Sequence, residues 1–168
     1  HRQHVPGESL DMDEAFEQVL VDLFDEPYLL TIGKSGLLWK LDRRTGEFQG
    51  LAQTVFQNVF SEVNLETGEV KYRDDIRNMQ IGAWLSVCPS TAGGHNWQSS
   101  TYHPLSRQLV IPLSQSCMEM SPREVSFEVG SGGTMADRRW VPMPGTNDEF
   151  GKPAAYAVDS RDEKTSIT

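Results

Sequence analysis

Hydrophobic positions along this chain form short runs that are rich in branched and aromatic residues. Turn-forming residues separate the runs at close and fairly even intervals, a pattern typical of β-strands in a sandwich, a barrel or a propeller. A helical spacing of apolar residues occurs only at 13–23 and around 51–60. The predicted strands cover residues 19–24, 28–32, 37–41, 68–73, 83–87, 108–114, 124–129 and 154–158.

One turn sequence occurs twice. Residues 41–47 (LDRRTGE) and 64–70 (NLETGEV) share Asp or Asn, two variable residues and then Thr-Gly-Glu, and 102–108 and 158–164 look like degraded copies. In such a turn the Asp or Asn side chain bonds back to the backbone, and the glycine supplies a positive φ where the chain enters the next strand. Such turns are common in β proteins, but their recurrence favours repeated hairpin units, as in propeller blades.

Composition limits the function classes. The chain has 168 residues, enough for one core, with 38% hydrophobic and 23% charged residues, as in a water-soluble globular protein. No apolar run approaches the ~20 residues that span a bilayer. The net charge of −9 argues against a nucleic-acid partner, because phosphates would be repelled. It fits a solvated surface, a basic partner or a cation site.

Two cysteines, Cys88 and Cys117, leave three interpretations: free core thiols, half of a metal site, or one disulfide. Neither has a neighbouring Cys or His at zinc-finger spacing, which argues against a structural zinc site. A disulfide would imply an oxidising compartment such as a periplasm.

The stretch 88–98 (CPSTAGGHNWQ) combines two glycines with a histidine, an amide and an indole. The glycines allow a sharp bend or a close approach to another group. The stretch is either one wall of a binding site or a turn followed by a buried tryptophan.

A family resemblance rests on these segments together. Residues 36–47 (GLLWKLDRRTGE) resemble the tryptophan-type blade motif of pyrroloquinoline-quinone-dependent methanol and ethanol dehydrogenases, the quinoprotein alcohol dehydrogenases. Residues 93–98 (GGHNWQ), followed by TYHP and QLVIPLSQSC, resemble the Gly-Gly-x-Asn-Trp segment of that family and the strand after it. The resemblance runs from about residue 7 to 159. It implies an all-β chain in which residues 1–168 form two to three blades of an eight-bladed β-propeller, in the middle of the large subunit.

The same resemblance places an aspartate that is both catalytic base and metal ligand at Asp11, within SLDMDEAFEQVLVD. The segment departs from the family pattern at Leu10, Glu14 and Phe16, where Trp, Gly and Asn are usual. Calcium-type members have a small residue at the position of Asp13, whereas lanthanide-dependent members carry an additional aspartate there. The alternatives are an acidic surface turn for Asp11 and a capping role for Asp13.

Further residues are assigned by the same resemblance. Lys34 falls where an Arg or Lys contacts the quinone, and Asn96 where an asparagine hydrogen-bonds it. Trp97 either packs beneath the cofactor or fills the core, and the core is the favoured interpretation. Cys88 and Cys117 fall where some members form a disulfide, which implies a periplasmic location.

The implied reaction is oxidation of an alcohol to an aldehyde or ketone. Asp11 would take the hydroxyl proton, the quinone would take the hydride, and a calcium or lanthanide ion would polarise the quinone. A c-type cytochrome is the implied electron acceptor.

The family polypeptide is several hundred residues long. Its vicinal disulfide, further metal ligands and stacking tryptophan are missing here, so this chain is expected to be a fragment that needs the remainder of the propeller and is inactive alone. The competing hypothesis is a non-enzymatic β-propeller or sandwich module that binds a partner through its loops.

Overall fold

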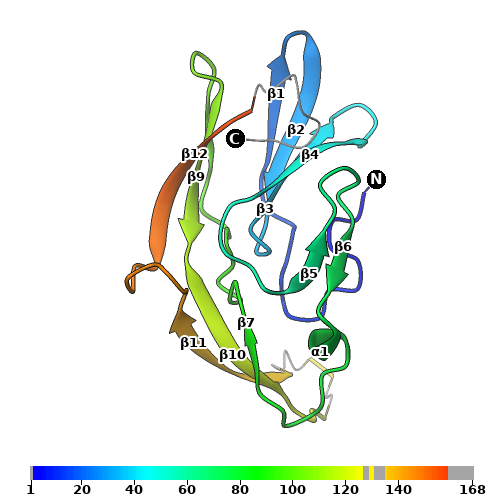
Figure 1. The fold of residues 1–168 in the computed structure, drawn as a ribbon. Coiled ribbons are helices and arrows are strands. Elements are labelled where there is room, and N and C mark those ends of the chain that lie inside the picture. The colour runs from blue at the N-terminus through cyan, green and yellow to red at the C-terminus, as the bar shows by residue number, and fades with distance from the viewer. Residues whose placement is uncertain (1, 127–128, 131–134, 159–168) are drawn as a thin grey trace.

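The computed structural model describes residues 2–126, 129–130 and 135–158, and the regular secondary structure of these residues is almost entirely β-strand. They form antiparallel sheets ordered β1-β2-β3-β4, β11-β10-β7, β12-β9-β8 and β5-β6 (Figure 1). The elements are β1 (Gln18–Leu23), β2 (Glu26–Ile32), β3 (Leu37–Asp42), β4 (Phe48–Gln53), β5 (Phe60–Val63), β6 (Val70–Tyr72), α1 (Asp74–Arg77), β7 (Leu85–Val87), β8 (Thr101–His103), β9 (Gln108–Ser114), β10 (Ser116–Pro122), β11 (Ala136–Pro142) and β12 (Gly151–Ala157).

Strand β3 is the most deeply buried element of the four-stranded sheet. Trp39 in its centre is fully buried and lies opposite Thr31 of β2 and Leu51 of β4. Because β3 is covered on both faces, its sequence LLWKL is a continuous apolar run with one lysine rather than an alternating pattern.

Two hydrophobic clusters fill the interior, and β3 contributes to both of them. One contains residues of the β1-β2-β3-β4 sheet, β9 and the disulfide. The other contains residues of β3, β5 and β10. The first contains Val21, Leu23, Leu30, Ile32, Leu38, Val55, Cys88, Leu109, Ile111, Leu113, Cys117, Met143 and Val158. The second contains Val5, Leu10, Met12, Leu37, Trp39, Leu51, Val59, Phe60, Ile76, Val87, Met118, Met120 and Ala136.

The two repeated turns have the predicted geometry. The side-chain oxygen of Asp42 accepts hydrogen bonds from the amides two and three residues later, at 2.7 and 3.2 Å. The side-chain oxygen of Asn64 accepts the equivalent bonds at 2.9 and 3.1 Å. Gly46 and Gly68 have φ of 77° and 70°. In the turn between β8 and β9, Arg107 takes the glycine place with a φ of 51°. Most of the fourth copy, 159–164, lies outside the described residues.

Both helix predictions were wrong. Residues 13–23 hold a loop and β1, in which the buried Val21 and Leu23 follow the alternation of a strand. Residues 51–60 hold the end of β4, a loop and the first residue of β5. The strand prediction at 124–129 was also wrong for 124–126, which have no regular structure, and 127–128 are not described. Strands β4, β5, β8, β10 and β11 and the four-residue α1 were not predicted.

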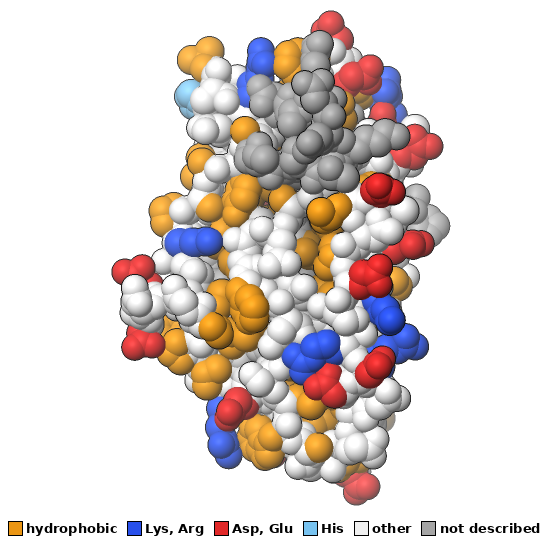
Figure 2. Space-filling model, in the orientation of Figure 1, with side chains coloured by type: hydrophobic (Ala, Val, Ile, Leu, Met, Phe, Trp, Pro, Cys, Tyr) orange, Lys and Arg blue, Asp and Glu red, His pale blue; other side chains and the backbone are white. Residues whose placement is uncertain are grey.

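The surface is uneven in polarity. Figure 2 shows apolar side chains gathered on the side where β9, β10, β11 and β12 lie in Figure 1. Trp84, Trp140 and Phe150 are among the large apolar side chains that are exposed. Among the described residues, no helix has the length and apolar character to cross a membrane.

Candidate active site

Asp11, Asp13 and Lys34, which the resemblance assigns to one site, lie together in one cluster. The Lys34 ammonium lies 2.5 Å from Oδ2 of Asp13 and 3.2 Å from Oδ1 of Asp11, and it also donates to the Asp11 carbonyl at 3.1 Å. The lysine side chain is only 10% exposed, whereas the two carboxylates are 47% and 56% exposed. The two aspartates therefore converge on one cation, which is buried beneath them.

The backbone at Asp11 is unusual. Its φ of 69° lies in the left-handed region, which few residues other than glycine adopt and which Asp tolerates better than most. Such conformations occur preferentially at functional sites, where they aim a side chain. Here the bend lets residues 11 and 13 present their carboxylates to the same ammonium.

The turn that carries Lys34 is fixed from both sides. Its amide donates to the Asp13 carbonyl at 2.9 Å, and its carbonyl accepts from Gly94 at 2.8 Å. A Cβ on Gly93 would lie 2.7 Å from Cα of Lys34, and one on Gly94 would lie 2.6 Å from Cα of Gly36. The two glycines of the 88–98 stretch are therefore needed for close packing against the lysine turn.

The charge of Lys34 is stabilised by its two partners. Burial alone would lower the pKa of the ammonium, but the hydrogen bonds to Asp13 and Asp11 and their negative charges outweigh it. The pKa of Lys34 is consequently raised above its ordinary value, so the side chain is a permanent cation at physiological pH.

Arg138 is a fourth member of the cluster that the sequence did not indicate. Its Nη1 lies 3.5 Å from Oδ2 of Asp11, and its side chain is 20% exposed. Arg138 is on β11, far from Asp11 in the sequence, and the sequence carried no signal for this contact because β11 itself was not predicted.

The cluster borders a cavity of about 610 Å³. Its lining includes Asp11 and Arg138 together with three methionines, Met79, Met120 and Met135. Methionine side chains are flexible and polarisable, and they adapt to ligands of irregular shape. The cavity can thus hold a small molecule in contact with the Asp11 carboxylate.

Carboxylate oxygens are the donors that calcium and other hard cations prefer. Asp11 and Asp13 already turn toward one positive charge, and in that respect they fit a metal ion. Within the described part of the chain, no group of three or more His, Cys, Asp or Glu side chains could hold a metal. A complete coordination shell would need further ligands from a cofactor or from additional polypeptide.

The other residues of the 88–98 stretch lie beyond the glycines. Asn96 is half-buried and donates to the Ala92 carbonyl at 3.2 Å. The core interpretation of Trp97 was wrong: its side chain is 79% exposed. His95, which had no predicted role, is the buried residue instead, with Nδ1 3.1 Å from the Pro112 carbonyl. Exposure increases along the chain after the glycine turn, from the buried His95 through the half-buried Asn96 to the exposed Trp97, so the indole lies outside the core.

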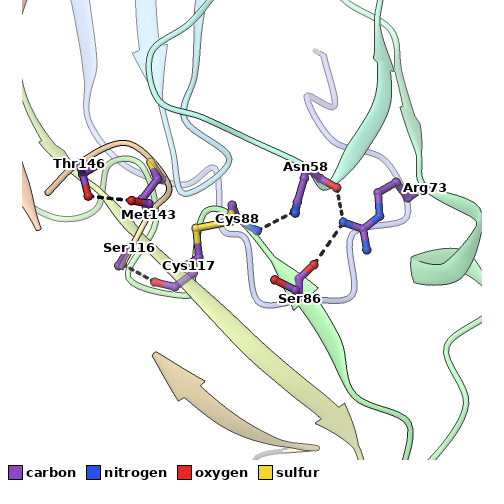
Figure 3. The surroundings of a disulfide bond; sticks show 9 residues. Asn58, Arg73, Ser86, Cys88, Ser116, Cys117, Met143 and Thr146 are labelled. Atoms are coloured by element: carbon purple, nitrogen blue, oxygen red, sulfur yellow. Dashed lines mark hydrogen bonds between the residues drawn. A yellow bond between two sulfur atoms is a disulfide. The ribbon is translucent and has the colours of Figure 1, made fainter. Parts of the chain in front are cut away.

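Cys88 and Cys117 form a disulfide between the end of β7 and β10 (Figure 3). Both residues are buried in the first hydrophobic cluster. The Cys88 amide donates to the side chain of Asn58 at 2.8 Å, and Arg73 donates to the Asn58 carbonyl at 2.8 Å. The bond closes the segment that holds Gly93, Gly94 and Asn96, and so it restrains the wall that packs on Lys34.

Comparison with known proteins links this geometry to a family. The chain is 26% identical over 133 residues to the lanthanide-dependent methanol dehydrogenase of Methylacidiphilum fumariolicum, a match that covers 77% of the chain and 22% of that protein. It also superposes on a europium-containing methanol dehydrogenase with a TM-score of 0.84 and 25% identity, over 92% of the chain and 28% of that structure. The chain is homologous to part of the quinoprotein alcohol dehydrogenases.

One further relative is similar in sequence, and one further solved structure has the same fold. Subunit 1 of the cytochrome c methanol dehydrogenase of Methylobacterium organophilum is 28% identical over 119 residues, 66% of the chain and 18% of that subunit. A quinohemoprotein alcohol dehydrogenase from Comamonas testosteroni has the same fold, with a TM-score of 0.70 at 18% identity over 93% of the chain and 24% of that structure. No family model matches the chain. The chain thus spans between 18% and 28% of the length of these proteins.

Proposed function

We propose that this chain supplies part of the active site of an alcohol dehydrogenase that uses pyrroloquinoline quinone and a bound calcium or lanthanide ion. The observation that carries the proposal is the convergence of Asp11 and Asp13 on the buried ammonium of Lys34, in a chain homologous to quinoprotein dehydrogenases. The product is the aldehyde or ketone of the alcohol.

Asp11 is the proposed catalytic base. Its carboxylate is half-exposed at the wall of the 610 Å³ cavity, where it can accept the proton of a substrate hydroxyl. Lys34 remains protonated because its pKa is raised, and it provides a fixed positive charge beside the reacting groups. When bound, the quinone supplies the hydride acceptor and the metal ion supplies a Lewis acid.

Asp11 and Asp13 are the proposed metal ligands from this chain. Both are anionic oxygen donors, and each additional anionic oxygen favours a trivalent ion more than a divalent one. The presence of a second aspartate beside Asp11 therefore favours a lanthanide over calcium. A relative named as lanthanide-dependent supports this preference.

Asn96 and Trp97 are the proposed cofactor contacts on the 88–98 wall. The amide of Asn96 can offer hydrogen bonds, and the exposed indole of Trp97 offers an apolar face to a planar ring. They come two and three positions after Gly94, which packs against the turn that carries Lys34, and this places them near the proposed site.

Residues 1–168 are proposed to form two to three blades of an eight-bladed β-propeller. The repeated turns and the series of antiparallel sheets support blades, and β11 and β12 each end their sheets without a further strand among the described residues. The remainder of the propeller would cover those edges. The disulfide supports a periplasmic location, and relatives named for cytochrome c support a c-type cytochrome as electron acceptor.

The test uses the full-length protein purified from cells supplied with calcium and lanthanum. Bound metal and quinone are quantified, and dye-linked alcohol oxidation is measured for the wild type and for Asp13→Asn. We expect the wild type to carry lanthanum and the variant to lose it. Asp25→Asn is the matched control, because Asp25 is an exposed aspartate in a hairpin turn away from the site.

A wild type that holds only calcium, with metal and activity unchanged in Asp13→Asn, would contradict the lanthanide assignment and leave Asp13 structural. A full-length protein that binds neither quinone nor metal would instead support the non-enzymatic binding module. We also expect no dye-linked activity from the isolated 168-residue chain, because most of the site is missing from it.

A further inference from the structure

The carboxylate of Asp11 is held from two directions. Lys34 lies 3.2 Å from Oδ1, and Arg138 lies 3.5 Å from Oδ2. The lysine belongs to the turn after β2, whereas the arginine belongs to β11, which pairs with β10 through Met120. One cation on each oxygen fixes the plane of a carboxylate more firmly than two cations on the same oxygen would.

Arg138 is suited to hold another group rather than to react. A guanidinium keeps its proton in proteins, so it exerts a constant charge and cannot compete for the substrate proton. The Nε of Arg138 is buried and has no hydrogen-bond partner among the described residues. An unsatisfied buried donor is destabilising, and such a cost is often retained at functional sites.

The oxygen that Arg138 contacts belongs to a residue lining the cavity. Asp11 and Arg138 both border the 610 Å³ cavity, next to Met79 and Met120. Arg139, the next residue of β11, is 66% exposed and forms its ion pair with Glu119 at 3.8 Å. Strand β11 thus carries one arginine coupled to the proposed base and one, Arg139, that is coupled to a different carboxylate and does not line the cavity.

We propose that Arg138 is a positioning residue that holds Oδ2 of Asp11 at the wall of the substrate cavity. This inference rests on the proposed function, in which Asp11 accepts the hydroxyl proton. When the aspartates engage a metal ion, Arg138 keeps the second oxygen of Asp11 oriented toward the substrate. The arginine transfers no proton and touches no reacting atom.

The test compares Arg138→Met, Arg138→Lys and Arg139→Met in the full-length holoenzyme. We expect Arg138→Met to lower kcat about 10- to 100-fold with little change in KM, because a misplaced base slows the chemical step without weakening substrate binding. Arg138→Lys, which keeps the charge, should recover part of that loss. Arg139→Met should retain the wild-type kcat, and quinone and metal contents should be the same in all four proteins.

The outcomes distinguish a failure of the positioning role of Arg138 from a failure of the proposed function. If the wild type oxidises no alcohol, the proposed function fails. If the wild type is active and Arg138→Met matches Arg139→Met, or if Arg138→Met loses its metal or quinone, the positioning role is refuted while the proposed function stands. Thermal unfolding of each variant checks the fold, and Arg138→Gln replaces Arg138→Met under the same criteria if the latter does not fold.

Discussion

The disulfide should stabilise the wall of the candidate site mainly by restricting the unfolded chain. Cys88 and Cys117 are separated by 29 positions, and closing a loop of that size removes about 3.6 kcal/mol of denatured-state entropy at 25 °C in the chain-entropy model. Both residues are buried, so Cys88→Ala with Cys117→Ala also loses some apolar packing. We expect the free energy of opening of β7 and β10 to fall by roughly 3–4 kcal/mol.

Native-state hydrogen exchange of the full-length protein measures this quantity, because exchange of the β7 and β10 amides reports the free energy of opening of that unit. A loss of roughly 3 kcal/mol corresponds to exchange about 100-fold faster, since each 1.4 kcal/mol is a factor of ten. Ser90→Ala with Ser116→Ala is the matched control. It removes a buried hydrogen bond of 2.7 Å between the same two segments and should cost only about 1 kcal/mol.

The reasoning would be refuted if the cysteine double variant exchanged no faster than the serine control. That result would mean that the segment between β7 and β10 is already restricted in the open state without the covalent link.

Two further results are expected. Hydrogen bonds from Arg44 hold the pKa of Asp42 at about 2, so the contribution of this turn to stability is complete above about pH 4 and is lost as the pH falls toward 2. The turn at Asn64 does not titrate and serves as the control. The ratio of amide exchange protection at the two turns, measured as a function of pH, tests this expectation. Gly94→Ala should cost roughly 1–3 kcal/mol and reduce alcohol oxidation, because its Cβ would enter the lysine turn, whereas Gly151→Ala has room for its Cβ and should leave thermal unfolding unchanged.

The sequence predicted the features that depend on local chemistry. The turns at Asp42 and Asn64 follow from side chains that bond to their own backbone, and most strands coincide with apolar runs. By contrast, β10 and β11 contain glutamate, aspartate and arginines, so their hydrophobic pattern is weak. They are strands because they pair with each other and with β7, a long-range fact that a local pattern does not contain.

Part of the candidate site could likewise be predicted, because some of its residues lie close together in the sequence or in recognisable motifs. Asp11 and Asp13 are two positions apart, and the family motifs assigned Lys34 to the same site. The three side chains lie together in the structure, and their roles stay predictions. Arg138 reaches the cluster only through the pairing of β11, and the exposure of Trp97 depends on which way the chain leaves the glycine turn. Neither of these can be read from residue spacing.

The most direct test of the central claim is the rate at which a saturating alcohol reduces the bound quinone in a single turnover of the full-length holoenzyme. Asp11→Asn keeps a residue that tolerates the left-handed backbone but removes the carboxylate, and Asp25→Asn makes the same change at a φ of 68° in a surface turn. Loss of a general base predicts a reduction that is about 10²- to 10⁴-fold slower in Asp11→Asn and unchanged in Asp25→Asn. Reduction of the quinone in Asp11→Asn at the wild-type rate would contradict the assignment of Asp11 as the base.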